Sequence, residues 1–137
     1  MPIEMNELFG IAGKVAVITG AGGVLGGNIA KHFMRQGAKV VAVDIRQEQL
    51  DKRVSELKQY GNEVIGVVGD VLDVASLGKL AGQVLSQWGK IDILLNIAGG
   101  NMPGATLEPE QHFYDMDIAC WEKVTGLNMN GTVYPSM

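Results

Sequence analysis

The sequence predicts an α/β fold in which a doubly wound parallel sheet lies between layers of helices, and three observations support this. Short apolar runs alternate with helix-period segments along the chain. The apolar runs do not alternate with polar residues, which is typical of strands buried on both faces of a parallel sheet. The connections are too long for hairpins, so right-handed crossovers between parallel strands are expected.

The strands are predicted from four apolar runs. Each run is short and rich in valine, isoleucine or leucine, and the fourth is interrupted only by Asp92. About four strands make an incomplete version of the full doubly wound sheet, which has six. The runs cover residues 15–18, 40–43, 64–68 and 91–95.

Three amphipathic segments between the runs predict helices. The first helix begins inside a glycine-rich stretch, and a glycine follows each segment as a stop signal. Asp73 is the expected N-cap of the third helix. The apolar stripes consist of Leu25, Ile29 and Phe33, then Leu50, Val54 and Leu57, then Leu77, Leu80, Ala81, Val84, Leu85 and Trp88.

The last part of the chain is predicted as a loop followed by a helix. The loop covers residues 99–116, and the helix is expected to begin near Asp117 and to carry Asn128. In the preceding helix, Gly78 and Gly82 each cost about 1 kcal/mol relative to alanine. Their spacing of four places both on one face, where close packing on the sheet is the expected reason.

Composition and charge narrow the classes of function. The chain has 137 residues, and we expect one domain over residues 1–137. Its 19 glycines are about twice the usual share and lie at chain reversals. The net charge is -4 and basic residues form no stripe, so a nucleic-acid surface is not expected.

The chain also carries no sign of membrane insertion or secretion. No apolar run approaches the roughly 20 residues of a membrane span, and no signal peptide is recognisable at the N-terminus. Cys120 is the single cysteine, so it forms no internal disulfide and is expected to be a buried spectator. These features predict a cytoplasmic protein.

A glycine-rich turn follows the first strand and leads into the first helix. Backbone N–H groups at a helix N-terminus bind phosphate, and glycine lets a ligand approach the main chain closely. The strict Gly-x-Gly-x-x-Gly fingerprint is not met, because Leu25 occupies the third glycine position and Gly26 follows one residue later. A plain tight turn is the alternative, but the position in the first βαβ unit favours a diphosphate site.

Asp44 closes the second strand and is the candidate ribose-binding acid. It lies 44 minus 26, or 18, residues after Gly26, close to the roughly 20 expected in dinucleotide-binding folds. A carboxylate there accepts hydrogen bonds from the adenosine ribose and repels a 2′-phosphate, which favours NAD over NADP. Arg46 could soften this preference. Capping of the next helix is an alternative role that does not exclude binding.

Together these residues resemble the short-chain dehydrogenase/reductase family, which has a Rossmann-type sheet. Its signature Thr-Gly-x-x-x-Gly-x-Gly matches at Thr19, Gly20 and Gly26, while Val24 replaces the middle glycine. Residues 70–71 resemble the family's acidic–apolar pair that contacts adenine. Residues 96–99 resemble its Asn-Asn-Ala-Gly motif, with Ile97 in place of one asparagine. The cofactor-binding residues implied are Gly20, Gly22, Gly23, Val24, Leu25, Gly26, Asp44, Asp70, Val71, Asn96, Ala98 and Gly99.

The resemblance also implies which catalytic groups the chain carries. Asn128 falls where the family keeps an active-site asparagine in its fourth helix. The family's catalytic Tyr-x-x-x-Lys pair is not found, because the residues four positions after Tyr60 and Tyr114 are Val64 and Ile118, and the third tyrosine is followed by only three residues. We therefore expect that the chain stops before the catalytic segment and that this fragment alone transfers no hydride.

The function implied is hydride transfer between NAD(H) and the carbonyl or hydroxyl group of a small-molecule substrate. Residues 22–26 and 99–101 are similar to a subgroup of D-mannonate oxidoreductase or fructuronate reductase-like proteins, which implies a sugar acid such as fructuronate or mannonate. Alternatives are a non-catalytic dinucleotide-binding module or sensor, and an interaction protein in which the last helix pairs with a second copy. The full-length form is expected to be a homo-oligomer, either a dimer or a tetramer.

Overall fold

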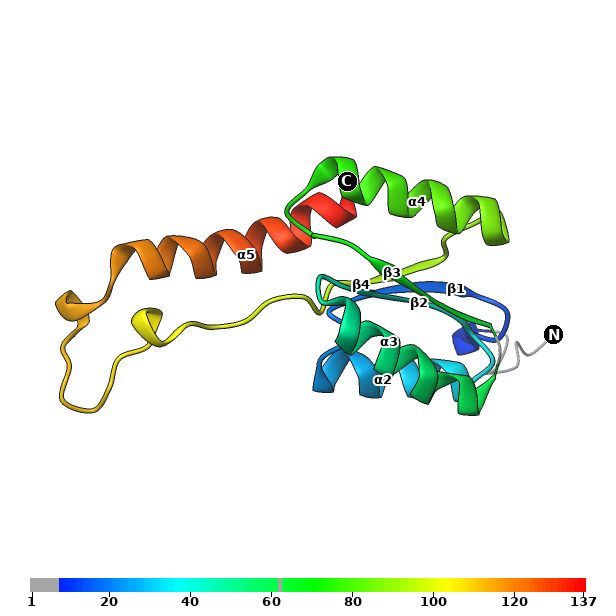
Figure 1. Ribbon diagram of the computed structural model, residues 1–137, viewed down its shortest axis with the longest axis horizontal. Coiled ribbons are helices and arrows are strands. Elements are labelled where there is room, and N and C mark those ends of the chain that lie inside the picture. The colour runs from blue at the N-terminus through cyan, green and yellow to red at the C-terminus, as the bar shows by residue number, and fades with distance from the viewer. Residues whose placement is uncertain (1–7, 62) are drawn as a thin grey trace.

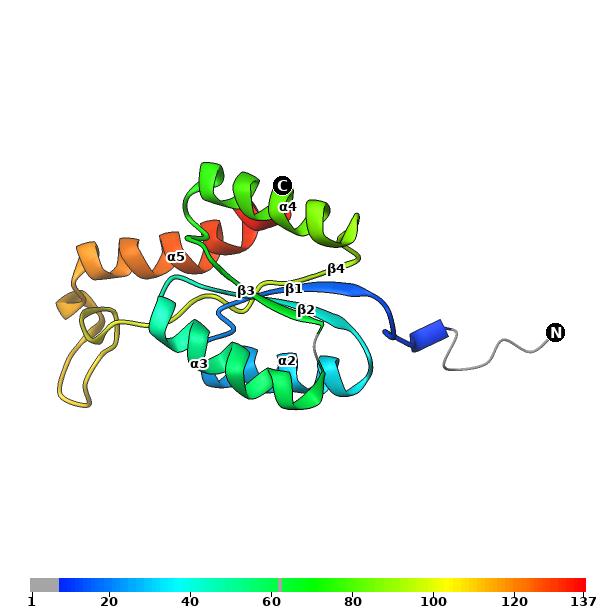
Figure 2. The same cartoon turned by 45° about the vertical axis from the view of Figure 1, so that its right-hand side comes forward.

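The computed structural model describes residues 8–61 and 63–137, and its sheet confirms the predicted fold class. Four parallel strands are hydrogen-bonded in the order β3-β2-β1-β4. Helices α2 and α3 cover one face of the sheet, and α4 and α5 lie on the other (Figures 1 and 2). The strands are β1 (Val15–Thr19), β2 (Lys39–Asp44), β3 (Val64–Val68) and β4 (Ile93–Leu95). The α-helices are α2 (Val24–Arg35), α3 (Gln47–Leu57), α4 (Val74–Trp88) and α5 (Ile118–Ser136), and the short 3-10 helices are η1 (Lys58–Tyr60), η2 (Pro103–Ala105) and η3 (Phe113–Asp115).

The core consists of two apolar layers, one on each face of the sheet. Alternate residues of a strand point to opposite faces, so Ile18 of β1 packs towards α2 and α3 while Val17 packs towards α4. Leu50 of α3 and Val84 of α4 are fully buried in these two layers. Burial of each such side chain contributes about 1.5–3 kcal/mol, so these layers fix the central strands in place.

Aspartates cap two of the helices, and the cap at Asp73 and the start of α5 near Asp117 are confirmed. The side chain of Asp73 accepts a hydrogen bond from Ala75 N at 2.9 Å at the start of α4. Asp117 accepts one from Cys120 N at 3.1 Å at the start of α5. A carboxylate at the N-cap satisfies an otherwise unpaired N–H group and complements the helix dipole. Cys120 itself is half-buried beside η2 rather than fully buried as expected.

The predicted apolar stripe of α2 is confirmed at Ile29 and Phe33, which are partly buried against the core, but it is wrong at Leu25. Leu25 is exposed, and the residues that α2 buries are Gly26, Gly27, Ala30 and Met34. The small residues let the helix backbone approach the glycine turn closely, since a Cβ on Gly26 would lie 2.5 Å from the carbonyl oxygen of Gly20. Close approach therefore decides which side of the helix is buried, and the large apolar side chains lie beside this contact.

The predicted packing role of Gly78 and Gly82 is also wrong. Both glycines are exposed, and a Cβ at either would meet nothing within 4 Å in the described part of the chain. The side of α4 that faces the sheet is formed by Leu80 and Val84. The two glycines therefore lie on the solvent side of this helix.

The outer strands depart from the expectation that all four runs are buried on both faces. In β3, Gly66 and Val68 are exposed, and β4 is only half-buried, because both strands lie at edges of the four-stranded sheet. The fourth strand begins at Ile93 rather than at residue 91. Asp92 precedes it, and its carboxylate accepts the hydrogen bond of Val15 N at 2.8 Å. This side-chain bond takes the place of a regular ladder rung.

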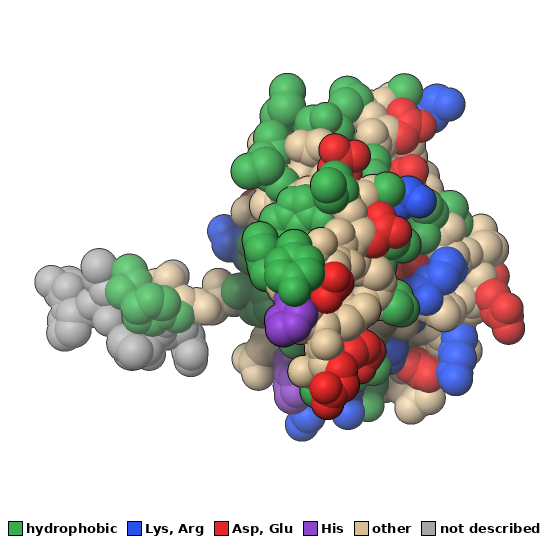
Figure 3. Space-filling view, turned by 90° about the vertical axis from the view of Figure 1, so that its left-hand side faces the viewer, with side chains coloured by type: hydrophobic (Ala, Val, Ile, Leu, Met, Phe, Trp, Pro, Cys, Tyr) green, Lys and Arg blue, Asp and Glu red, His purple; other side chains and the backbone are tan. Residues whose placement is uncertain are grey.

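The loop before α5 and the first turns of this helix extend away from the sheet (Figure 1). Phe113, Tyr114, Ile118 and Trp121 are exposed there, and Figure 3 shows hydrophobic side chains gathered on this end of the molecule. Within residues 8–61 and 63–137, no helix combines the length and apolar character needed to cross a bilayer.

Candidate functional site

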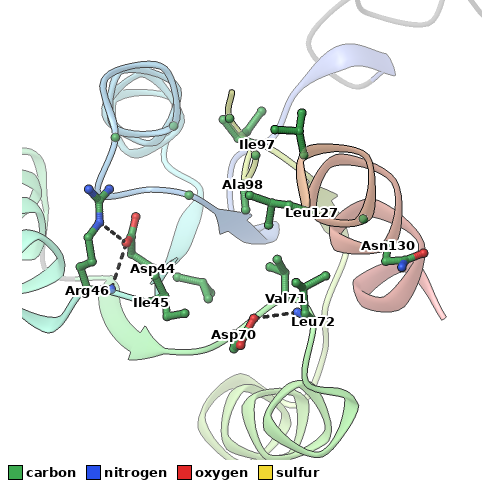
Figure 4. A pocket seen from close by; sticks show the side chains of 18 of the residues that line it. Asp44, Ile45, Arg46, Asp70, Val71, Leu72, Ile97, Ala98, Leu127 and Asn130 are labelled. Carbon is green, nitrogen blue, oxygen red and sulfur yellow. Dashed lines mark hydrogen bonds and ion pairs between the residues drawn. The ribbon is translucent and has the colours of Figure 1, made fainter. Parts of the chain in front are cut away.

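A cleft of about 950 Å³ lies at the carboxyl ends of the strands, between the glycine turn, the ends of β2 and β3, and α5 (Figure 4). This is the edge of a parallel sheet where ligands bind in doubly wound folds. The structure brings most of the predicted cofactor residues together here, although they come from four separate segments of the chain. The predicted residues that line the cleft are Gly20, Gly23, Val24, Leu25, Gly26, Asp44, Asp70, Val71, Ala98 and Gly99.

The glycine turn begins at a residue that only glycine can occupy without strain. Gly20 has φ of +66°, and a Cβ there would lie 2.8 Å from the backbone nitrogen of Ala98. The turn is tied to the sheet by Ala21 N, which donates to the carbonyl oxygen of Val43 at 2.9 Å. The floor of the cleft is therefore a main-chain surface formed by two loops in contact.

The N-terminus of α2 lacks the side-chain cap that α4 and α5 have. Its N-cap residue is Gly23, which has no side chain, so no side-chain acceptor caps the N–H groups of this helix within the described residues. The first N–H groups of a helix have no partner within the helix, so they remain available to a ligand in the cleft. Val24 is the first residue of α2, where the backbone is helical. The replacement of the family's glycine at this position therefore imposes no backbone strain.

Asp44 is held in the cleft wall by three hydrogen bonds. Its Oδ2 atom accepts from Gly22 N at 3.0 Å, and its Oδ1 atom accepts from Arg46 N at 3.1 Å and from Arg46 Nε at 3.3 Å. The side chain is 5% exposed. A carboxylate has about four acceptor sites, so capacity remains for one further donor. Asp44 does not cap α3, because the N-cap residue of α3 is Arg46.

These contacts explain why Gly22 is outside the lining of the main cleft. A Cβ on Gly22 would lie 2.6 Å from Asp44 Oδ2, so the absence of a side chain lets the acid reach the backbone nitrogen. Gly22 lines a smaller neighbouring cleft of about 440 Å³. Gly22 therefore contacts Asp44 through its backbone nitrogen and does not line the main cleft.

Asp70 and Val71 form the wall opposite Asp44 (Figure 4). Only Gly69 separates them from the end of β3. The N–H group of Gly69 donates to the carbonyl oxygen of Asp44 at 3.1 Å, and this bond joins the two walls. The carboxylate of Asp70 accepts from Leu72 N at 2.8 Å. Val71 is buried against α5, since a Cβ on Gly131 would contact it at 3.0 Å.

Thr19 connects β1 to the loop after β4. Its hydroxyl donates to the carbonyl oxygen of Leu95 at 3.4 Å and accepts from Ile97 N and Ala98 N, both at 3.1 Å. A single side chain thereby replaces several backbone rungs at the point where the sheet opens into the cleft. The position of Ala98 in the cleft depends on this hydroxyl.

Asn96, a predicted cofactor residue, lies outside the lining of the cleft. Its Nδ2 atom donates to Ser136 Oγ at 3.0 Å, so the side chain faces the end of α5. Its Oδ1 atom is buried and has no hydrogen-bond partner among residues 8–61 and 63–137. The structure therefore places Asn96 between β4 and α5.

Asn128 also lies outside the lining but is linked to it. Its Oδ1 atom accepts from Gly100 N and its Nδ2 atom donates to the carbonyl oxygen of Gly100, both at 2.9 Å. This double contact fixes α5 against the loop that carries Gly99 and Gly100 at the cleft. In its present contacts the side chain positions the main chain beside the cleft.

Sequence reasoning missed several residues that line the cleft. Ile45 and Leu72 directly follow Asp44 and Val71, so the strand ends gave a signal for them. Arg46 and Ile97 were named in the sequence analysis, but not as residues that line the cleft. Residues on α5 gave little signal, because this helix has no pronounced apolar stripe from which its orientation could be inferred. The missed lining residues on α5 include Leu127, Asn130 and Tyr134.

Parallel strands in this order, with a glycine turn and a cleft at their carboxyl ends, define a Rossmann-like α/β protein. Within that class the comparison with family models is specific. The model described as short chain dehydrogenase matches residues 14–137. The chain therefore belongs to the short chain dehydrogenase family, as the sequence motifs indicate.

Individual relatives agree with this assignment. The chain is 37% identical over 144 residues to the uncharacterized oxidoreductase UxuB of Bacillus subtilis, covering 99% of this chain and 50% of that protein. A solved structure from Haemophilus influenzae, assigned as a D-mannonate oxidoreductase and holding NAD, is 33% identical with a TM-score of 0.85, covering 92% of this chain and 49% of the other. The NADH complex of 3-ketoacyl-(acyl-carrier-protein) reductase from Brucella melitensis is 31% identical with a TM-score of 0.77, covering 92% and 48%. The chain thus spans about half the length of the relatives it matches.

Proposed function

We propose that this chain is the cofactor-binding part of an NAD(H)-dependent short-chain dehydrogenase that acts on the carbonyl or hydroxyl group of a small molecule. The observation that carries the proposal is the uncapped N-terminus of α2 in the same cleft as the buried carboxylate of Asp44. Free N–H groups suit a diphosphate, and an oriented carboxylate suits a ribose diol.

The glycine turn and Asp44 are the residues whose geometry supports binding of NAD in the cleft. Gly20, Gly23 and Gly26 offer main chain without side chains where the diphosphate would lie, and a Cβ on Gly20 or Gly26 would fill space already occupied by backbone. Asp44 would hold the adenosine ribose. NAD(H), when bound, accepts or supplies the hydride. The remaining roles proposed from the family motifs are adenine contacts at Asp70 and Val71 and the nicotinamide-side ribose region at Asn96, Ala98 and Gly99.

Asp44 supports NAD rather than NADP as the preferred cofactor. Its carboxylate is almost fully buried, so its charge is poorly screened, and a 2′-phosphate on the adjacent ribose would be repelled. Arg46 is the opposing influence, because its guanidinium pairs with the same carboxylate and its side chain is 57% exposed. The preference between NAD and NADP depends on whether the charge of Asp44 or that of Arg46 dominates at the ribose. The charge of Asp44 is buried and therefore less screened, so we expect NAD to be preferred.

For Asn128 we propose a positioning role in the proton relay that the family's tyrosine and lysine complete. The support is its double hydrogen bond with Gly100, next to the proposed nicotinamide-side residues. In this chain no tyrosine has a lysine four residues later. We therefore propose that the chain alone transfers no hydride. Measurable NADH turnover by a preparation confirmed by mass as this chain would refute that.

For the substrate we propose a sugar acid such as fructuronate or mannonate. The support is the sequence of residues 22–26 and 99–101, together with the similarity to the Haemophilus influenzae protein assigned as a D-mannonate oxidoreductase. NADH oxidation by the intact protein with fructuronate, compared with a ketose that lacks the carboxylate, tests the proposal. Equal or faster turnover of the neutral ketose would contradict it.

We also propose that the intact protein is a cytoplasmic homo-oligomer, either a dimer or a tetramer. The exposed apolar side chains of α5, including Ile118, Trp121 and Met129, support an association surface. Analytical ultracentrifugation of the intact protein should show a dimer or tetramer. A monomer at micromolar concentration would contradict the oligomer.

The test of the cofactor assignment is calorimetric titration of the intact protein with NADH and NADPH. Asp44→Ala should weaken NADH binding by about tenfold to a hundredfold, because the charged hydrogen bond that its remaining acceptor site offers to the ribose is lost. Asp51→Ala is the matched control: Asp51 is an exposed acid on α3 that bonds Gln47, and its loss should leave the affinity within about twofold. Absence of binding of either nucleotide by the unmodified protein would end the proposal. Binding without turnover on any carbonyl substrate would favour the non-catalytic module.

A further inference from the structure

One arginine of α3 holds the glycine turn from the side away from the main cleft. Arg53 Nε donates to the carbonyl oxygen of Ala21 at 3.1 Å, and Arg53 Nη2 donates to that of Gly23 at 3.2 Å. Its Nη1 atom pairs with Glu56 Oε2 at 2.7 Å. All three nitrogens are thus engaged, and the side chain is 23% exposed. The turn is bridged to α3 by a planar, permanently charged group.

The bond to Gly23 determines where a backbone donor points. A trans peptide group is planar, so its C=O and N–H groups point in opposite directions. The carbonyl oxygen of Gly23 also accepts the first helical bond of α2, from Gly27 N at 3.0 Å. The N–H group of Val24, in the same peptide plane, therefore points back out of the helix N-terminus. By holding this carbonyl, Arg53 fixes the direction of a donor that an anion would meet.

The bond to Ala21 reaches the second element of the cofactor site. The carbonyl group of Ala21 shares a peptide plane with the N–H group of Gly22, which donates to Asp44 Oδ2 at 3.0 Å. Arg53 therefore restrains the peptide group that orients the ribose-binding acid. A single side chain thus supports both the diphosphate end and the ribose end of the proposed site.

Gly27 provides the space that this arrangement needs. A Cβ at Gly27 would overlap the guanidinium group of Arg53. Gly27 follows the residues that match the family's glycine signature, and it does not line either cleft. The absence of a side chain at Gly27 is therefore explained by the space that Arg53 needs, and not by contact with a phosphate group.

We propose that Arg53 is a positioning residue for nucleotide binding, which pre-organises the turn at residues 20–24 and depends on Gly27 to do so. Glycine loses more backbone conformational entropy than other residues when it is ordered. If Arg53 orders the turn before the nucleotide arrives, binding no longer carries that cost, and the nucleotide binds more tightly. The inference rests on the proposed NAD(H) function, because it concerns the affinity of the same site.

The test measures NADH affinity of the intact protein by calorimetry, at a temperature below the unfolding midpoint of every variant. Arg53→Ala should weaken binding by about tenfold, the effect expected from the loss of two charged hydrogen bonds that order the site. Arg53→Lys keeps the charge but cannot bridge both carbonyls, so it should lose nearly as much. Lys79→Ala, which removes one exposed charge from α4 and lies outside both clefts, should change affinity by less than about twofold.

The coupling to Gly27 separates positioning from general destabilisation. Gly27→Ala should also weaken NADH binding, because the new methyl group displaces the guanidinium. Since both changes act through one contact, the double variant should bind no more weakly than Arg53→Ala alone, within about twofold. Multiplicative losses in the double variant, unchanged affinity in Arg53→Ala, or full affinity in Arg53→Lys would overturn the inference. If the unmodified protein binds no NADH or NADPH, the proposed function itself fails.

Discussion

The two faces of the sheet differ in how completely helices cover them. On the face covered by α2 and α3, Ala30, Met34, Leu50 and Leu57 are buried against the strands. On the opposite face α4 buries Leu80 and Val84, and α5 buries only Gly131 among its residues. The glycine turn and Asp44 therefore lie beside a packed scaffold, whereas α5 contributes a half-exposed wall to the cleft.

The strands show the same difference. The two central strands, β1 and β2, are buried over almost their whole length, whereas β4 has three residues and all are half-buried. Besides its backbone ladder with β1 and the half-buried Leu94 and Leu95, the β4 side depends on individual side-chain hydrogen bonds. Those bonds are made by Thr19, Asp92 and Asn128. Packing stabilises one half of the cleft and individual hydrogen bonds stabilise the other, so the two halves should respond differently to substitution.

The largest expected difference comes from truncating one leucine on each face. Leu50 in α3 is 1% exposed and Leu85 in α4 is 48% exposed. Leu50→Ala should lower the free energy of unfolding by about 3 kcal/mol, because it leaves a cavity, whereas Leu85→Ala should cost less than about 1 kcal/mol. Chemical denaturation measures both changes. Equal losses would contradict the difference in burial between these two positions.

A smaller loss is expected from adding one methyl group where α2 meets the turn. In Gly26→Ala the new Cβ would lie 2.5 Å from the carbonyl oxygen of Gly20, so the helix or the turn must move. We expect a loss of about 2 kcal/mol in unfolding free energy and weaker NADH binding in calorimetry. Normal stability with normal NADH affinity would mean that α2 does not depend on close approach.

The matched glycine on the other face should respond with the opposite sign. Gly82 lies within α4, is exposed, and has open space around it in the part of the chain that the structure describes. Gly82→Ala should raise the unfolding free energy by about 0.5–1 kcal/mol, because alanine loses less backbone entropy in a helix. A destabilised Gly82→Ala variant would indicate that this face is covered in solution.

The smallest effect concerns pH and the hydrogen bonds of the β4 side. The hydrogen bond from Lys90 and the bond from Val15 N lower the pKa of Asp92 below its ordinary value of 3.8. The ionised carboxylate thus adds stability above its ordinary pKa, and this stability is lost as the pH falls through the lowered value. Asp92→Asn should therefore be less stable than the unmodified protein at neutral pH, and the difference should vanish in acid. Thermal unfolding at both pH values checks this, and a difference that persists in acid would contradict it.

Local signals in the sequence were sufficient for the central fold and for most of the cleft. Val15 and Val40 lie in uninterrupted apolar runs, Asp73 and Asp117 precede helical periods, and Asp44 follows a strand at the distance that a dinucleotide fold requires. Each of these inferences uses neighbours within a few residues, or one spacing along the chain. The structure agrees with them because the same local physics determines strands, caps and turns.

The remaining features depend on contacts between distant parts of the chain. Which side of α2 is buried follows from the approach of Gly26 to Gly20, and β3 is exposed because strand order places it at an edge. The partners of Asn96 and Arg53 lie 40 and about 30 residues away in the chain. Periodicity contains no information about such pairs, so the sequence identified Asn96 by motif but could not tell which way it faces.

The amide of Asn128 has a consequence for how α5 can move. Its carbonyl and amino groups each meet the complementary main-chain atom of Gly100, much as two bases pair edge to edge. Neither a carboxylate nor a simple hydroxyl side chain offers a donor and an acceptor in that arrangement. If α5 slid or rotated by one residue, both bonds would break together. The side chain of Asn128 alone therefore fixes the register of α5 against the loop.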